Sequence, residues 1–302
     1  MKINYTSGCI CDSLTIDGKE SADLSPKVIK DAIVKALEKI DDMATLQDIL
    51  TTVAETGEYE DLGHCEPPIL LKFNMKAEEY FGDWIDVIDK EELRKVVTWV
   101  NKVNSADLCP SPKNIFRAFR ACSFKDCKVV FLGQDPYPQR GVATGILFGN
   151  SEDTQEDYLS PSLKIVKEAA INYEIPHNLI EFDNTLESWA EQGILMINTA
   201  LTCEVGRVGA HFDIWKPFVS KLIHNMSYKD GGMIYVLFGS QAGLFKNDIV
   251  NSLKTIEVYH PAYYARTGKK MPSSVFTDIN QALKQQYNYQ IEFYKETEYG
   301  TC

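Results

Sequence analysis

The segment from Lys128 to Gly141 combines side chains that can do chemistry with a backbone that cannot continue as regular structure. Val129 to Leu132 is a short β-branched and apolar run of the kind found in buried strands. The residues that follow, Gly133-Gln-Asp-Pro-Tyr137, supply an amide, a carboxylate and an aromatic ring, and their glycine and prolines interrupt both strand and helix. Many Asp-Pro pairs are plain turns. The position of this one predicts that Asp135 is held on a stiff turn in an active site.

Three further predicted strands end in polar residues in the same way. They cover residues 194–197, 233–238 and 255–259 and lead into Asn198, Ser240 and His260. The intervening segments have helical patterns over 114–122, 162–170, 185–192 (with Gly193 as the C-terminal stop) and 213–226. We therefore expect an α/β fold, a three-layer α/β/α arrangement around a central four-stranded, mostly parallel sheet. In such sheets ligands bind beyond the carboxyl ends of the strands.

Several short motifs occur in the order and at the spacing of a known family. They are Gly133 to Tyr137, Gly145-Ile-Leu-Phe148, Pro161-Ser-Leu163, Leu186 to Thr202, Leu237-Phe-Gly-Ser240 and His260-Pro261, preceded by Pro112 to Phe119. In these motifs the chain resembles the family 1 type of the uracil-DNA glycosylase superfamily. The resemblance spans roughly residues 80–290 and does not cover the N-terminal quarter.

The resemblance implies a monofunctional hydrolase of base excision repair, which cleaves the N-glycosidic bond of uracil in DNA and leaves an abasic site. Such a reaction separates charge between a cationic sugar and an anionic base. By resemblance, Asp135 orients the attacking water and stabilises the sugar cation, and His260 donates a hydrogen bond to the uracil oxygen that becomes negative. No metal and no other cofactor is expected.

The resemblance also implies which residues recognise the base. The planar amide of Asn198 fits the Watson–Crick edge of uracil and mismatches that of cytosine. Phe148 would stack on the base, and the Tyr137 ring would fill the space that a thymine methyl needs. Backbone donors near Gln134 would complete the pocket.

Uracil must leave the duplex to reach such a pocket, at a cost of a few kcal/mol. In the family, small loops grip the phosphates while this happens, and they position the strand without reading its sequence. The matching positions in this chain are Pro110, Pro112, Ser162, Gly239 and Ser240. The alternative role for Ser162 is that of a helix cap, and the phosphate contact is the favoured one.

Two positions depart from the family pattern. Pro138 stands where the first motif usually closes with His, and His260-Pro-Ala-Tyr-Tyr264 stands where His-Pro-Ser-Pro-Leu is usual. The apolar wedge that fills the vacated base stack is thus replaced by Tyr264 or, as second choice, Tyr263. The alternative is that both rings pack on the rim of the sheet. Arg266 would face nearby phosphates.

A formal charge of −12 argues against a general nucleic-acid binder. Residues 1–75 carry 7 Lys or Arg and 14 Asp or Glu, a net charge of −7, which leaves −5 for residues 76–302. Binding of uracil-containing DNA, single- or double-stranded, therefore requires a locally basic rim. The candidates for that rim are Lys113, Arg117, Arg120, Arg140, Lys164, Arg266 and Lys269.

No apolar run approaches the roughly 20 residues of a membrane span, and the chain begins without a signal-peptide pattern. We expect a soluble intracellular monomer, in the cytoplasm or in the nucleus of a eukaryote, with no membrane partner. The eight cysteines lack the spacing of a disulfide framework and are expected to be reduced. A zinc site formed by Cys9, Cys11, His64 and Cys65 is a less favoured alternative.

Residues 1–75 form a predicted acidic, partly helical extension before a catalytic domain over 76–302. Ser25-Pro26 begins a helical pattern that reaches Ile40, residues 48–53 form a second one, and Glu66-Pro-Pro68 breaks the chain. The extension would dock on the main domain, recruit a protein partner or mimic acidic nucleic acid.

Two alternatives to an active uracil-DNA glycosylase remain open at this level. The altered loop after His260 and the acidic extension also suit a non-catalytic DNA-binding or assembly protein on the same scaffold. A glycosylase with a shifted base preference is the other.

Overall fold

The computed structural model describes residues 3–6, 13–16, 19–20, 77–174 and 178–297. The chain divides into two compact units, one of residues 1–76 with 104–106 and one of residues 77–103 with 107–302. In the first unit, strands β1 (Ile3–Thr6), β2 (Ser13–Ile16) and β3 (Lys19–Glu20) form an antiparallel sheet in that order. The predicted helices over 25–40 and 48–53 and the break at 66–68 lie outside the described residues.

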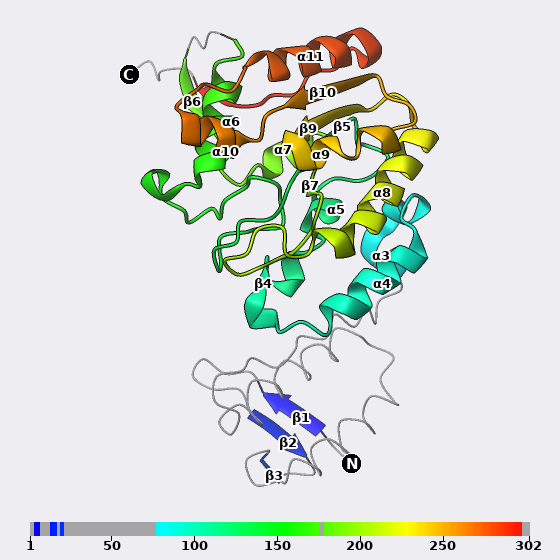
Figure 1. Ribbon diagram of the computed structural model, residues 1–302. Helices are drawn as coiled ribbons and strands as arrows, with labels where there is room; N and C mark the ends of the chain where they lie inside the picture. Colours follow the sequence, from blue (N-terminus) through cyan, green and yellow to red (C-terminus); the bar gives the residue numbers. More distant parts are fainter. Residues whose placement is uncertain (1–2, 7–12, 17–18, 21–76, 175–177, 298–302) are drawn as a thin grey trace. The chain divides into compact units, whose positions relative to one another are not determined.

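A four-stranded parallel sheet organises the second unit (Figure 1). Its strands lie in the order β10 (Lys254–Val258), β9 (Ile234–Phe238), β5 (Val129–Gly133) and β7 (Ile194–Asn198). All three pairings are parallel, and Gly133 at the end of β5 lies opposite Asn198 at the end of β7. The expected α/β fold with a central four-stranded parallel sheet flanked by helices is confirmed.

The predicted helices between the strands are also confirmed. They are α5 (Arg117–Ala121), α6 (Pro161–Ile171), α7 (Glu187–Glu191) and α8 (Phe212–Lys229). The structure adds α3 (Ala77–Phe81), α4 (Lys90–Val100), α9 (Gly239–Gly243), α10 (Pro261–Thr267) and α11 (Ser274–Tyr287), with short 3-10 turns at Gly82–Asp86, Ser105–Asp107, Pro112–Asn114, Glu156–Tyr158 and Lys246–Asp248. Two small antiparallel pairs join β4 (Leu108–Cys109) to β8 (Cys203–Glu204) and β6 (Leu179–Glu181) to β11 (Lys295–Thr297).

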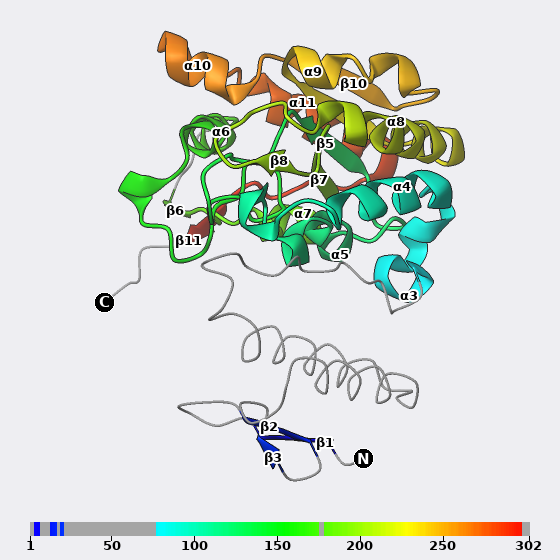
Figure 2. The same cartoon turned by 60° about the horizontal axis from the view of Figure 1, so that its bottom comes forward.

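Helix α4 shows how local sequence sets one of these added elements. Asp89 caps its first turn by accepting a hydrogen bond from the Glu92 amide at 2.9 Å. Leu93, Val96 and Val100 recur at helical spacing and are buried. The helix lies beside α8 in both views (Figure 1 and Figure 2).

Two clusters of buried aromatic side chains fill the space between the sheet and the helices. One joins the segment before α4 to α5 and α8, through Trp84, Phe116, Phe119, Trp215 and Phe218. The other joins β5 to α7 and α11, through Phe131, Trp189, Phe276 and Phe293. The Trp84 and Trp189 indoles donate to backbone carbonyls, of Cys122 at 2.7 Å and of Phe293 at 3.0 Å, so neither ring is buried with an unsatisfied donor.

The cysteines that the structure describes (Cys109, Cys122, Cys127 and Cys203) are buried free thiols. The four residues of the alternative zinc site lie outside the described ranges, and within those ranges no group of three or more His, Cys, Asp or Glu side chains is placed to hold a metal. Across the same ranges, no helix is both long and apolar enough to cross a bilayer.

Gly193 ends α7, as the sequence predicted, and provides a test of the fold. Its φ is +94°, and a Cβ built on it would lie 2.3 Å from the Asp126 carbonyl oxygen. Gly193→Ala should therefore lower the free energy of unfolding by about 2–4 kcal/mol. Gly268, with φ of +67° and open space around a built Cβ, is the matched control. Gly268→Ala should cost about 1–2 kcal/mol, the backbone strain alone. Urea denaturation measures both, and equal losses would contradict the proposed clash.

Candidate active site

The turn after β5 is tied to the chain that leaves β7. The Thr199 amide donates to the Gly133 carbonyl at 3.0 Å, and the Thr199 hydroxyl donates to the Gln134 carbonyl at 2.8 Å. These bonds extend the strand pairing into the loops. They bring Asp135 and Asn198, which are 63 residues apart in the sequence, to the same edge of the sheet.

Asp135 lies partly buried, with its two carboxylate oxygens in different situations. Oδ2 accepts a hydrogen bond from the Gly209 amide at 2.9 Å. Oδ1 is buried and has no hydrogen-bond partner among the described residues. Burial raises the pKa of Asp135 above its ordinary value, although hydrogen bonds from Gly209 and the Gln134 side chain act in the opposite direction. One oxygen is thus held in place while the other remains available to a donor.

The loop that supplies the Gly209 amide was not singled out in the sequence. A buried network anchors it, in which the Trp215 indole donates to the Thr202 hydroxyl at 2.7 Å and that hydroxyl bonds His211 Nδ1 at 3.0 Å. Val208, from the same loop, is 60% exposed and lines the cavity described next. The glycines around Val208 mark a turn in the sequence, but nothing in the local pattern links that turn to Asp135.

A cavity of about 220 Å³ opens at the carboxyl ends of the strands. Seven residues predicted from the sequence line it, namely Gln134, Asp135, Tyr137, Phe148, Ser162, Asn198 and His260. Asn198 Oδ1 is buried there without a hydrogen-bond partner among the described residues. Buried polar atoms in folded proteins are almost always paired. Two such acceptors in one cavity, on Asp135 and Asn198, indicate a ligand that brings donors.

Phe148 forms an apolar wall of this cavity and has an unusual backbone. Its φ is +64°, which is rare for a residue with a large side chain. The ring packs edge-on against Phe238 at 5.1 Å and against His260 at 5.6 Å. The Tyr137 hydroxyl donates to the Phe148 carbonyl at 2.9 Å, so the two rings are fixed relative to each other.

His260 follows β10 and begins helix α10. Its Nδ1 accepts a hydrogen bond from the Ala262 amide at 3.2 Å. Because that nitrogen is an acceptor, the proton of the neutral ring resides on Nε2. Burial lowers the pKa of His260 to about 4. At neutral pH the cavity therefore contains a neutral imidazole with one N–H donor.

The residues predicted to grip phosphates differ in exposure. Pro110, Pro112 and Ser162 are buried, whereas Ser240 and Arg266 are exposed. Gly239 is half-buried, and a Cβ built on it would lie 2.9 Å from the Cβ of His260. Ser160, not Ser162, holds the N-cap position of α6. Ser162 is the only member of this set that lines the cavity in the described residues.

Tyr264 is placed differently from the wedge expected from the sequence. Its ring is 6% exposed and packs edge-on against Tyr259 at 6.3 Å and Tyr263 at 5.3 Å. Tyr259 is 65% exposed, and Tyr263 stacks on it with ring centroids 4.6 Å apart. Tyr264 is therefore packed on the rim of the sheet, as in the alternative interpretation of the sequence. The step from Tyr263 to Tyr264 along α10 turns the Tyr264 side chain toward the interior.

Several cations of the predicted basic rim bond to the protein itself. Arg117, Arg120 and Lys164 donate to protein acceptors, and Lys269 donates to the Tyr263 hydroxyl at 3.3 Å. Such contacts bind these groups to the fold and compete with phosphate contacts.

Comparison with known proteins agrees with this geometry. A model of the uracil DNA glycosylase superfamily matches residues 119–284. A uracil-DNA glycosylase of Borrelia turicatae is 32% identical over 68% of this chain and 92% of the relative, and that of Clostridium perfringens is 32% identical over 68% and 93%. The crystal structure of mimivirus uracil-DNA glycosylase (21% identity, TM-score 0.55) covers 72% of this chain and 93% of its own. A variant of the mimivirus protein in complex with UGI (22% identity, TM-score 0.58) covers 68% and 83%. The chain belongs to the uracil-DNA glycosylase superfamily.

Proposed function

We propose that this protein hydrolyses the N-glycosidic bond between uracil and deoxyribose in DNA and leaves an abasic site for repair. The observation that carries the proposal is a single cavity lined by a carboxylate, an amide, an aromatic ring and a neutral imidazole. Two buried acceptors in it lack hydrogen-bond partners within the described part of the chain. The same four side chains argue against the non-catalytic alternative, since a protein that only binds DNA has no need of them.

Asp135 suits the part of the reaction that involves the sugar. Its unpaired Oδ1 can accept a hydrogen bond from the attacking water, while the Gly209 amide holds Oδ2. The negative charge of the carboxylate stabilises the cationic sugar of the transition state, and burial strengthens that attraction by excluding water. Breaking the C–N bond sends the electron pair to the base, which leaves as the uracil anion. The water oxygen then bonds to the sugar carbon as one of its protons passes to Asp135 Oδ1, and the uracil anion takes up a proton from solvent.

His260 suits the part that involves the leaving base. Since the Ala262 amide occupies Nδ1, the ring presents Nε2–H as a donor to the uracil oxygen on which negative charge develops. The low pKa of His260 means that this donor is the same neutral ring over the physiological pH range.

Base recognition would fall to the remaining walls of the cavity. Asn198 Oδ1 can accept from uracil N3–H while its Nδ2 donates to a uracil oxygen, and cytosine offers the reverse pattern. Phe148 would stack on the ring of the base. The half-buried Tyr137 ring, which lines the cavity, would exclude a thymine methyl, which argues against a shifted base preference.

The DNA strand would be positioned by few contacts. We assign phosphate contacts to Ser240, Arg266 and the loops at Pro110, Pro112, Ser162 and Gly239, on the grounds of the family motifs. Stacking in the vacated duplex is better suited to the pair of exposed Tyr259 and half-buried Tyr263 than to the buried Tyr264. A protein partner that binds through residues 1–75 remains part of the proposal, as does a monomeric state.

Removal of the Asp135 charge tests the central assignment. Asp135→Asn should slow release of free uracil by two or more orders of magnitude, because it removes the main electrostatic stabiliser of the sugar cation. Asp153→Asn, an exposed carboxylate in a turn, should leave the rate unchanged. Uracil release from single-stranded oligonucleotides, measured in EDTA, is the assay. An Asp135→Asn protein as fast as wild type would sink the mechanism.

The pH dependence of kcat/KM separates the two catalytic groups. The active form requires ionised Asp135, so activity falls as pH drops through the pKa of that carboxyl, which burial places above the ordinary value of about 3.9. No second decline is expected near the ordinary histidine pKa of about 6.5, because the pKa of His260 is lowered to about 4. His260→Gln should reduce the rate about a hundredfold without moving the acid limb. A limb near 6.5 that disappears in His260→Gln would contradict the neutral donor.

The aromatic loop provides a test on two substrates. Tyr263→Ala should reduce uracil release from duplex about five- to a hundredfold more than from single strands, because only a duplex has a stack to refill. Tyr264→Ala should lower the melting temperature and reduce both activities alike, because that ring is buried. The opposite outcome, a duplex-specific loss in Tyr264→Ala alone, would restore Tyr264 as the wedge.

A further inference from the structure

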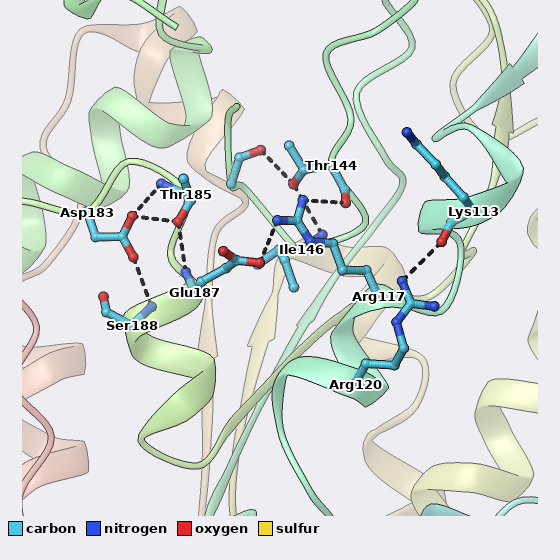
Figure 3. A network of polar contacts seen from close by, with 10 residues as sticks. Lys113, Arg117, Arg120, Thr144, Ile146, Asp183, Thr185, Glu187 and Ser188 are labelled. Carbon is cyan, nitrogen blue, oxygen red and sulfur yellow. Dashed lines mark hydrogen bonds and ion pairs between the residues drawn. The ribbon is translucent and has the colours of Figure 1, made fainter. Parts of the chain in front are cut away.

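Arg117 joins helix α7 to the start of the loop that carries Phe148, through the contacts drawn in Figure 3. From α5, its Nη1 donates to the Thr144 carbonyl at 3.3 Å, and its Nη2 donates to the Glu187 carboxylate at the start of α7. The two side chains are 30% and 41% exposed, so the ion pair lies at the edge of the core. One guanidinium thus bonds simultaneously to the loop and to a neighbouring helix.

The loop of residues 144–150, here named the stacking loop, is held by bonds within it and by close contact with neighbouring segments. The Thr144 hydroxyl accepts from the Ile146 amide and donates to the Gly149 carbonyl, both at 3.3 Å. At the far end of the loop, the Asn150 amide donates to the Asn184 carbonyl at 2.9 Å. A Cβ built on Gly145 would lie 1.9 Å from the Asn114 carbonyl oxygen, so the loop lies directly against the chain before α5.

The Glu187 end of the ion pair is itself anchored. Asp183 accepts hydrogen bonds from the Thr185 amide at 2.8 Å, the Thr185 hydroxyl at 2.6 Å and the Ser188 amide at 2.9 Å (Figure 3). Although burial acts to raise it, these bonds hold the pKa of Asp183 below its usual value. The Thr185 hydroxyl also accepts from the Glu187 amide at 3.2 Å. This first turn of α7 is therefore a fixed support.

A fixed support matters because the stacking loop contains the positive φ of Phe148. A non-glycine residue in that region persists only where its surroundings enforce the conformation. On one side the Tyr137 hydroxyl holds the Phe148 carbonyl at 2.9 Å. On the other side, the guanidinium of Arg117 holds the start of the loop by donating to the Thr144 carbonyl. A lysine could keep the ion pair but not both bonds in fixed geometry.

We propose that Arg117 is a positioning residue for Phe148, that it acts together with Glu187, and that it thereby sets the affinity of the cavity for uracil. The proposal rests on the proposed function, since it takes uracil as the stacked base. The sequence had suggested Arg117 as a cation of the basic rim that contacts phosphates. The proposal instead gives its side chain a structural role in the protein.

The kinetic consequence is a change in binding more than in rate. A stacked ring contacts the base in both the ground state and the transition state, so its misplacement raises KM and leaves kcat nearly unchanged. Arg117→Gln should raise KM and the inhibition constant of free uracil about three- to tenfold, a modest effect because the ion pair is partly solvated. Arg117→Lys should recover part of the loss, and Glu187→Gln should raise both constants less than Arg117→Gln does.

A matched control and a structural measurement complete the experiment. Lys254→Gln breaks an ion pair of similar exposure, 38% and 40%, between Lys254 and Asp278, and neither residue lines the cavity. Hydrogen exchange of the amides of residues 144–150 should accelerate in Arg117→Gln and not in Lys254→Gln. This measurement needs no substrate, so it decides the role of Arg117 even if the wild-type protein releases no uracil, which would refute only the proposed function.

The outcomes separate clearly. Faster exchange in the stacking loop together with a raised uracil inhibition constant, both absent from Lys254→Gln, supports the proposal. Unchanged loop exchange in Arg117→Gln overturns it. So does a loss confined to kcat, or a loss that Lys254→Gln reproduces with the same drop in melting temperature.

Discussion

The parallel pairing of β5 with β7 and β9 is the constraint on which the rest of the site depends. It aligns the carboxyl ends of these strands, and the bonds from Thr199 to the turn after β5 extend that alignment into the loops. Asp135 and Asn198 consequently lie at one edge with an unpaired acceptor each. A shift of one residue in the register would turn the side chain of Asn198 to the other face of the sheet and dismantle the cavity.

Burial at this edge shifts the pKa of both groups proposed for catalysis, Asp135 and His260, through one physical cause. Removing water disfavours the charged form of each, so the pKa of Asp135 rises and that of His260 falls to about 4. Hydrogen bonds from Gly209 and the Gln134 side chain oppose the effect of burial on the pKa of Asp135, whereas the imidazole of His260 is neutral at neutral pH. In the proposed mechanism, an anionic carboxylate and a neutral donor match the opposite charges that develop on the sugar and the base.

An acidic chain can bind a DNA substrate if it makes only a few contacts with the phosphates. With a net charge of −12 and several rim cations bonded to the protein itself, affinity cannot come from a broad basic surface. In the proposed function, recognition relies on the cavity, on backbone and hydroxyl contacts with phosphates, and on stacking by Tyr259 and Tyr263. This arrangement makes the precise placement of Phe148 more important than it would be in a strongly basic protein.

The sequence by itself predicted the four strands of the central sheet, the helices between them and the residues proposed for the site. Apolar periodicity located the strands, and Gly193 marked the end of α7. The position of polar residues directly after strands identified Asp135, Asn198 and His260 as candidates. All of these signals depend on residues close together in the chain. Only the tertiary structure decided which groups meet across long separations: the Gly209 amide on Asp135, Arg117 between Thr144 and Glu187, and the burial of Tyr264. Such partners are set by packing of distant segments, and a local pattern carries no record of them.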